Sequence, residues 1–133
     1  MVKTEIRVIY GDTDQMGVVY YANYLRYFEI GRNEYLRAHK VRYRELEAQH
    51  RLFLPVVDTQ VSYKSPARYD DLLTLETLIT RVGRASVRFE YRILRADTLL
   101  ATGHTMHACV TSAGTVTSLP EDFLLLLKAS PTL

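Results

Sequence analysis

The sequence predicts an α+β fold in which an antiparallel β-sheet wraps around one long central α-helix. Between residues 24 and 36, large apolar and aromatic side chains recur at steps of three and four, which is typical of a helix buried along one side. Segments before and after this helix alternate polar and apolar residues, as strands with one buried face do. Short turns join the later strands, so we expect neighbouring strands to run antiparallel.

The first half of the chain is expected to hold one strand and two helices. Residues 2–10 alternate and predict a strand, while residues 44–51 predict a short, mostly polar helix. The long helix is expected to begin at Ala22 or Asn23, with Asn23 as a candidate cap, and to end near residues 38–40. Its expected buried face consists of Tyr24, Leu25, Phe28, Gly31, Tyr35 and Leu36.

The second half reads as successive strands. Strands are predicted over residues 56–64, 72–82, 86–94 and 99–111, with a further short strand after the turn at residues 112–114. Leu119-Pro120-Glu121 then predicts a C-terminal helical turn, because proline and an acid are favoured in the first turn of a helix. A chain of 133 residues suits a single domain, residues 1–133.

Composition argues against several classes of partner. A net charge of +2 gives no strong field for nucleic acid or a membrane surface. No apolar run approaches the ~20 residues that span a bilayer, and residues 1–7 lack the apolar block of a signal peptide. Cys109 is the single cysteine and cannot form an internal disulfide, so a reducing cytoplasm is the expected location.

The candidate chemistry lies in the loop before the long helix. Asp14 follows Asp12 in a turn between Gly11 and Gly17, one loop away from the open end of the helix. The first backbone N–H groups of a helix have no internal partners, and the helix dipole adds partial positive charge there. A carbonyl oxygen aimed at that end would be polarised, and a carboxylate beside it could attack the carbonyl or activate water. The alternative is that Asp14 only forms the turn.

The same stretch resembles the signature of the 4-hydroxybenzoyl-CoA thioesterase family, which consists of hotdog-fold proteins. That signature reads roughly Tyr-x-x-Thr/Cys-Asp-x-x-Gly-Val-Val-Tyr/Phe-x-x-Asn-Tyr-Leu. The chain matches it at Tyr10, Thr13, Asp14, Gly17, Val18, Val19, Tyr20, Asn23, Tyr24 and Leu25. Phe28, Glu29 and Arg32 also occupy family positions, and a looser likeness extends to about residue 127.

This resemblance implies a hotdog fold, dimers with active sites at the subunit interface, and often tetramers. Asp14 occupies the place of the catalytic carboxylate, which acts either as a nucleophile through a mixed anhydride or as a general base toward water. The backbone N–H of Tyr21 takes the place of the donor to the thioester oxygen. Several relatives carry histidine at this position, whereas this chain has Tyr21, so the departure argues against an imidazole-assisted step. The Tyr21 ring is expected to shape the acyl pocket.

The resemblance also implies where coenzyme A binds. Family members hold its phosphates with basic residues in the link before the strand that begins at Ser86. Arg84 matches a basic position, whereas Gly83 and Ala85 replace basic residues, so fewer phosphate contacts are expected. The substrate-binding candidates are Arg84, Arg81, Gly83, Ser86 and Lys64. The alternative is that these arginines are ordinary solvated residues near a turn.

Other polar residues favour structural roles, and neither a metal nor an organic cofactor is expected. His104 and His107 are three apart on a strand and should face opposite ways, which argues against shared metal ligation. Asp12 is expected to form the turn; if close, its charge would raise the pKa of Asp14. Glu29 and Arg32 are expected to pair on the helix, with a role in steering substrate as the alternative.

The expected activity is therefore hydrolysis of an acyl-CoA to a carboxylic acid and free CoA. An acyl-carrier-protein thioesterase or an enoyl-thioester hydratase is an alternative on the same fold, although the hydratase usually needs an Asp and His pair and this loop has no histidine. A non-catalytic acyl-CoA binding module is the third hypothesis, but it would have little need for Asp14. The acyl group and the choice between dimer and tetramer stay open.

Overall fold

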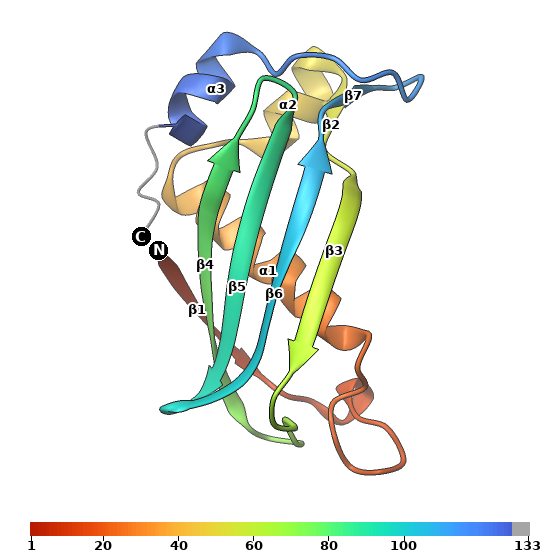
Figure 1. The fold of residues 1–133 in the computed structure, drawn as a ribbon, viewed down its shortest axis with the longest axis vertical. Helices are drawn as coiled ribbons and strands as arrows, with labels where there is room; N and C mark the ends of the chain where they lie inside the picture. Colours follow the sequence, from red (N-terminus) through yellow and green to blue (C-terminus); the bar gives the residue numbers. More distant parts are fainter. Residues whose placement is uncertain (129–133) are drawn as a thin grey trace.

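The computed structural model describes residues 1–128 as a five-stranded sheet with a long helix, α1 (Asn23–Ala38), lying across one face (Figure 1). The strands lie in the order β1-β4-β5-β6-β3, and every neighbouring pair is antiparallel. Their bounds are β1 Val2–Arg7, β3 Val56–Tyr63, β4 Leu72–Val82, β5 Ser86–Arg95 and β6 Thr98–Ala108. The predicted class, a sheet curled around one long helix, is confirmed.

Smaller elements cover the end of the sheet near the C-terminus of α1 (Figure 1). They are α2 (Tyr43–His50), the short antiparallel strands β2 (Leu52–Phe53) and β7 (Val110–Thr111), and α3 (Glu121–Lys128). The predictions of a second short helix and of a C-terminal helical segment are confirmed. The pairing of β2 with β7 was not predicted, because two-residue strands carry no alternation.

Two predicted strands have different bounds. The first strand ends at Arg7 rather than at residue 10, because the chain turns into a short 3-10 helix, η1 (Tyr10–Asp12). Tyr10 is exposed and its ring stacks on Tyr69 at 3.9 Å between centroids. The predicted strand 99–111 is divided at Cys109, whose N–H donates to the Ala85 carbonyl at 2.8 Å. The expected strand after residue 114 is reduced to a single bridge between Val110 and Val116.

The bounds of α1 agree with the prediction, but its cap and one position of its buried face need correction. Asn23 is the first helical residue and not the cap; its side-chain amide donates to the Asp12 carbonyl at 2.9 Å. Leu25 is 40% exposed, while Tyr27 is fully buried and replaces it on the core face. Both residues lie near the start of the helix, where the direction of the buried face depends on the adjoining loop rather than on the helical repeat.

The sheet and α1 pack closely where Phe28 lies on β5 and β6. The Phe28 ring stacks on Tyr91 at 4.2 Å between centroids. Gly103 on β6 lies beneath it, and a Cβ added there would be 2.5 Å from the Gln60 carbonyl oxygen and 2.6 Å from a Phe28 ring carbon. Gly103 therefore allows the helix to approach the sheet.

A row of polar side chains crosses this otherwise apolar core. His107 Nδ1 lies 2.9 Å from the Leu54 carbonyl oxygen and Nε2 lies 2.8 Å from Thr105 Oγ1, which in turn lies 2.6 Å from the Tyr91 hydroxyl. Burial lowers the pKa of His107 to about 4, so the ring is neutral at pH 7. His104 has a separate partner, Asp58, at 3.1 Å. The two histidines therefore do not share a site, as their spacing predicted.

The substitution Gly103→Ala is expected to destabilise the fold by about 1–3 kcal/mol, the usual cost of overpacking a close-packed core. The added methyl group would meet a backbone oxygen and an aromatic ring, neither of which can move freely. Urea denaturation measures the loss. Gly11→Ala is the control, because its Cβ would lie 3.8 Å from the nearest atom; equal losses in the two variants would contradict the close approach.

Protonation of His107 is expected to make the fold sensitive to acid. Its pKa is about 4 in the folded chain and 6.5 in the reference state. Unfolded chains therefore bind more protons below pH 6.5, and up to about 3 kcal/mol of stability is lost as the pH falls from 6.5 to 4. Urea denaturation across this range measures the slope. His107→Gln, which keeps a donor and an acceptor, should lack this part of the slope; an unchanged slope would contradict the assignment.

Candidate active site

A cleft of about 310 Å³ lies between the loop that precedes α1 and the end of β3. It brings together three of the residues singled out from the sequence, Asp14, Tyr21 and Lys64. Its lining consists of Asp14, Val18, Val19, Tyr21, Tyr24, Tyr63, Lys64, Ser65 and Pro66. The cleft thus combines one carboxylate, one amine and an aromatic wall at the N-terminal end of a helix.

Asp12 fixes the loop to the helix. Its carboxylate is buried and accepts hydrogen bonds from Arg26 and from the Tyr27 hydroxyl, the latter at 2.8 Å. The Asp12 carbonyl oxygen accepts from the Asn23 amide and from the Tyr20 N–H, each at 2.9 Å. Burial and the Asp12 carboxylate raise the pKa of Tyr27, which keeps this hydroxyl protonated as a donor. The prediction that Asp12 is structural is confirmed.

Asp14 is held differently. Its Oδ1 accepts from the backbone N–H groups of Met16 at 2.9 Å and Val18 at 3.4 Å. Gly17 has a φ of +80°, which closes the turn and lets its N–H donate to the Asp14 carbonyl at 3.0 Å. Within residues 1–128, Oδ2 has no hydrogen-bond partner. One carboxylate oxygen therefore orients the group and the other is free to react.

The start of α1 presents unpaired donors at the same cleft. The Asn23 N–H donates to the Tyr20 carbonyl at 2.9 Å, and the Tyr24 N–H reaches the Tyr21 carbonyl at 3.4 Å. The N–H groups of Tyr21 and Ala22 donate to no acceptor in the described part of the chain. An N–H at this position can stabilise negative charge on a bound oxygen, since the helix dipole has its positive end there.

Aromatic rings form the wall of the cleft. The Tyr63 hydroxyl donates to the Tyr21 carbonyl at 2.9 Å, and the Tyr63 ring meets Tyr24 edge-on with centroids 5.1 Å apart. A hydrogen bond with Tyr21 raises the pKa of Tyr20, and the negative charge of nearby Asp14 raises it further. Sequence reasoning missed Tyr63. Its position in the sequence could have indicated this place, because Tyr63 is the last aromatic residue before Ser65-Pro66, where the strand ends.

The other coenzyme A candidates lie elsewhere. Arg81, Gly83, Arg84 and Ser86 occupy the β4–β5 link, at the end of the sheet opposite the Asp14 loop (Figure 1). There the Gly83 N–H donates to the Ser86 carbonyl at 2.8 Å, and the Arg84 carbonyl accepts from Leu119 at 2.9 Å. Within one chain, therefore, only Lys64 of the five candidates lies at the cleft, and a role for the other four stays a prediction.

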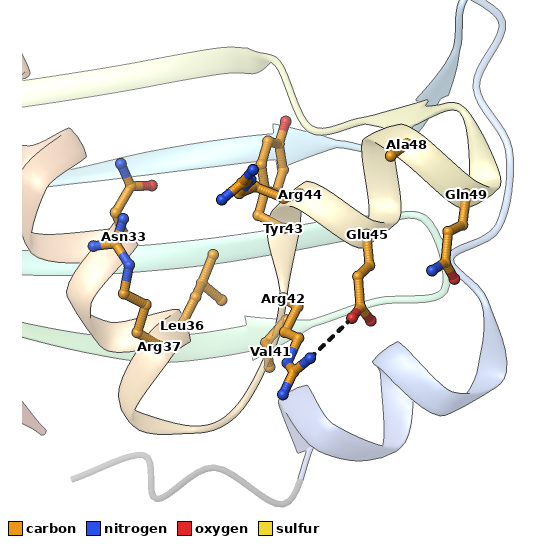
Figure 2. A pocket seen from close by; sticks show the side chains of 10 residues that line it. All are labelled: Asn33, Leu36, Arg37, Val41, Arg42, Tyr43, Arg44, Glu45, Ala48 and Gln49. Atoms are coloured by element: carbon orange, nitrogen blue, oxygen red, sulfur yellow. Dashed lines mark hydrogen bonds and ion pairs between the residues drawn. The ribbon is translucent and has the colours of Figure 1, made fainter.

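A larger cavity of about 550 Å³ lies where α1 meets α2, and Figure 2 shows three arginines around it. Arg37 forms an ion pair with Glu34, and Arg42 forms one with Glu45 at 3.1 Å. Neither the Asp14 carboxylate nor the open end of α1 reaches this cavity. We therefore place the candidate site at the smaller cleft.

The sequence model of the thioesterase-like superfamily matches residues 8–127 of this chain. The chain belongs to that superfamily. The acyl-CoA thioesterase YbgC of Haemophilus influenzae is 39% identical over 105 residues, covering 79% of this chain and 77% of YbgC. The predicted family and the prediction of an enzyme of the thioesterase class are thereby confirmed.

Solved structures place this thioesterase-like chain among hotdog folds, as predicted. A hypothetical protein of Thermus thermophilus has a TM-score of 0.89 at 33% identity, covering 95% of this chain and 96% of its own. A mutant 4-hydroxybenzoyl-CoA thioesterase solved with 4-hydroxybenzoyl-CoA has a TM-score of 0.86 and covers 95% of this chain and 97% of its own. Its identity of 23% supports the fold alone.

Residues 1–128 contain neither a metal-binding cluster nor a membrane-spanning helix. No three His, Cys, Asp or Glu side chains there are grouped so that they could hold a metal ion. Among the helices in that range, none has the length and apolar character needed to cross a membrane. The chemistry available at the cleft of this thioesterase-like chain is that of Asp14, the helix end, Lys64 and the tyrosines.

Proposed function

We propose that this chain is an acyl-CoA thioesterase that hydrolyses a thioester to a carboxylic acid and free CoA. The observation that carries the proposal is the pairing, in one cleft, of a half-free Asp14 carboxylate with the unpaired N–H of Tyr21 at the start of α1. The YbgC relative, named as an acyl-CoA thioesterase, supports the substrate class.

In this proposal the thioester carbonyl oxygen accepts a hydrogen bond from the Tyr21 N–H. Negative charge gathers on that oxygen as the carbonyl carbon is attacked, and one such backbone donor stabilises the transition state by roughly 3–4 kcal/mol. Since the donor is a backbone group, the Tyr21 side chain is free to serve as part of the acyl wall. The helix dipole adds to the effect.

Asp14 supplies the attacking group by one of two routes. As a nucleophile, its free oxygen bonds to the acyl carbon, CoA leaves as the thiolate, and water then hydrolyses the mixed anhydride. As a general base, it takes a proton from a water molecule that attacks the acyl carbon directly, and CoA leaves in the same way. Both routes end in a carboxylic acid and free CoA, and the geometry supports both.

We further propose that the enzyme works as a homodimer, or as a pair of dimers, joined at β3. This strand is one of the two edges of the described sheet, the other being β1, and Val56 and Val57 on it are exposed. Tyr63 and Lys64, at the end of the same strand, line the cleft. A second copy paired along β3 would enclose the cleft, and the Arg84 and Arg81 link of an assembled partner is the proposed phosphate site, with Gly83 and Ser86 shaping it.

Asp14→Asn is expected to lower kcat/KM by about 10²–10⁴-fold, the usual contribution of a carboxylate that transfers protons, while acyl-CoA binding is retained. Thiol release over a panel of acyl-CoA and acyl-carrier-protein thioesters measures turnover. Calorimetric titration with a non-hydrolysable thioether analogue measures binding. Asp97→Asn, in the exposed β5–β6 turn, is the matched control. Wild-type binding without turnover on any thioester would favour a non-catalytic binding module instead.

Thr59→Pro is expected to convert the dimer to a monomer. The Lys64 N–H faces β6, since it donates to the Leu100 carbonyl at 2.8 Å. In an antiparallel pair, the N–H groups of successive residues point to opposite sides of the strand, and the register from residue 58 to residue 63 is unbroken. The Thr59 N–H, five residues before Lys64, therefore faces the free edge. Proline at this position would remove a hydrogen-bond donor to the partner. Sedimentation equilibrium measures the mass.

Thr59→Ala is the control for this substitution, because it loses the hydroxyl bond to the His104 carbonyl but keeps the N–H. Circular dichroism shows whether each variant is folded. A monomeric wild type, or a Thr59→Pro variant that is folded and still dimeric, would contradict pairing at β3.

A further inference from the structure

The segment that joins β3 to β4, residues 64–71, forms one side of the Asp14 cleft. Its first residues line the cleft directly: Lys64, Ser65 and Pro66. The rest of the segment lies behind the Asp14 loop and does not reach the cleft. The proposed reaction uses this cleft but does not explain what holds the segment in place.

Ala67 connects the segment to the Asp14 loop. Its side chain is fully buried, and its carbonyl oxygen accepts a hydrogen bond from the Val19 N–H at 2.8 Å. The next residues along each stretch, Arg68 and Val18, pair in an antiparallel bridge. The end of the Asp14 loop is therefore bound to the segment by backbone contacts.

Val18 passes this restraint on to the carboxylate. The Asp14 N–H donates to the Val18 carbonyl at 2.9 Å, and the Val18 N–H donates to the Asp14 Oδ1 at 3.4 Å. A displacement of Val18 would therefore turn or release the carboxylate. Asp12 fixes the beginning of this loop through its bonds to α1, and the segment 64–71 fixes its end.

Arg95, at the end of β5, holds the segment itself. Its Nη1 donates to the Asp71 Oδ2 at 2.8 Å and to the Pro66 carbonyl at 3.3 Å. The same Asp71 oxygen accepts from the Arg68 N–H at 2.9 Å. One cation thus binds two points of the segment, on either side of Ala67. Arg95 is not among the residues that line the cleft.

The simplest role for this ion pair would be stabilisation of the fold. The Arg95 side chain is 38% exposed and that of Asp71 22% exposed, so solvent weakens the attraction and its contribution to global stability is small. Burial raises the pKa of Asp71, but hydrogen bonds from the Arg68 N–H and from Arg95, together with the Arg95 charge, hold it below its ordinary value. The pair is therefore charged at pH 7. A reaction rate is far more sensitive than stability to a small displacement of a reacting group.

We propose that Arg95, paired with Asp71, is a positioning residue for the Asp14 carboxylate. The ion pair keeps the segment 64–71 where Ala67 can bind the end of the Asp14 loop, and Arg95 does not touch the reacting atoms. This inference rests on the proposed thioesterase function for its effect on turnover. The position of the Asp14 turn can be measured without turnover.

In the first arm of the test, thiol release gives kcat and KM for the wild type and Arg95→Met, with the acyl-CoA of the panel that the wild type hydrolyses fastest. Because a displacement of about 1 Å can cost about 10²-fold in rate, Arg95→Met should lower kcat by about 10- to 100-fold. The Leu100 carbonyl accepts from the N–H groups of Lys64 and Ser65 independently of Arg95. KM should therefore change by less than about threefold.

Two further variants separate positioning from stability. In the wild type a single nitrogen of Arg95 serves both acceptors, and a lysine ammonium also has its donors on one nitrogen. Arg95→Lys should therefore restore kcat to within about threefold of the wild type. Arg92→Met is the matched control, because Arg92 lies on the same strand and pairs with Glu76 at 3.2 Å, away from the cleft. Its kcat should stay within about twofold of the wild type.

The second arm needs no turnover. The N–H groups of Met16 and Val18 both donate to the Asp14 Oδ1, so their amide resonances in NMR spectra report the position of the carboxylate. Arg95→Met should shift both resonances, and Arg92→Met should leave them unchanged. Asp71→Asn keeps an acceptor for the Arg68 N–H but removes the charge, so it should act like Arg95→Met in both arms. It replaces Arg95→Met if urea denaturation shows that variant to be unfolded.

The outcomes separate the claims. A loss of kcat that Arg95→Lys reverses, with shifted Met16 and Val18 resonances, supports the positioning role. An unchanged kcat, an equal loss in Arg92→Met, or a loss without shifted resonances would overturn this inference and leave the proposed function standing. A wild type that hydrolyses no thioester would overturn the proposed function. Shifted resonances would then still support placement of the turn by Arg95, and unshifted ones would overturn it.

Discussion

The hydrogen bonds of buried Asp12 are the constraint on which the candidate site depends. Arg26 and Tyr27 bind its carboxylate from the first turns of α1, and Asn23 binds its carbonyl oxygen. Four residues of one short stretch are thereby fixed to each other before any substrate is present. The position of the Asp14 loop relative to the helix end is set by these bonds, because a loop held only by its own turn would sample many positions.

Two acids two residues apart consequently have opposite roles. Asp12 is saturated by donors and faces inward, whereas Asp14 uses one oxygen to hold its own turn and leaves the other free. A carboxylate whose oxygens are all engaged would have to break bonds before it could attack or accept a proton. The sequence gives no direct sign of this division, since both residues are aspartates beside glycines in a turn.

Predictions from sequence succeeded where a hydrophobic periodicity extends over many residues. They failed where a single tertiary contact determines the role of a residue. Residues 72–82 were predicted as a strand and form β4 over that range, because alternation along a central strand reports its burial. Asn23 was predicted as a cap, yet its amide binds Asp12, a partner eleven residues away. Arg84 could be assigned to coenzyme A only by resemblance. Its distance from Asp14 follows from the direction of β4 and β5, which local patterns do not encode.

The separation of Asp14 from the Arg84 link along the sheet bears on the proposed dimer. Asp14 lies at one end of the sheet and Arg84 at the other (Figure 1). An extended acyl-CoA has its thioester carbonyl at one end and its phosphates at the other. In the proposed reaction, Asp14 and the cationic link must therefore lie within the length of one such molecule, facing each other rather than at opposite ends of one strand. In the proposed dimer, a two-fold axis at the free edge of β3 would reverse one sheet relative to the other. That reversal would place the cationic end of one copy on the side where the Asp14 loop of its partner lies, which a single chain of this fold cannot do.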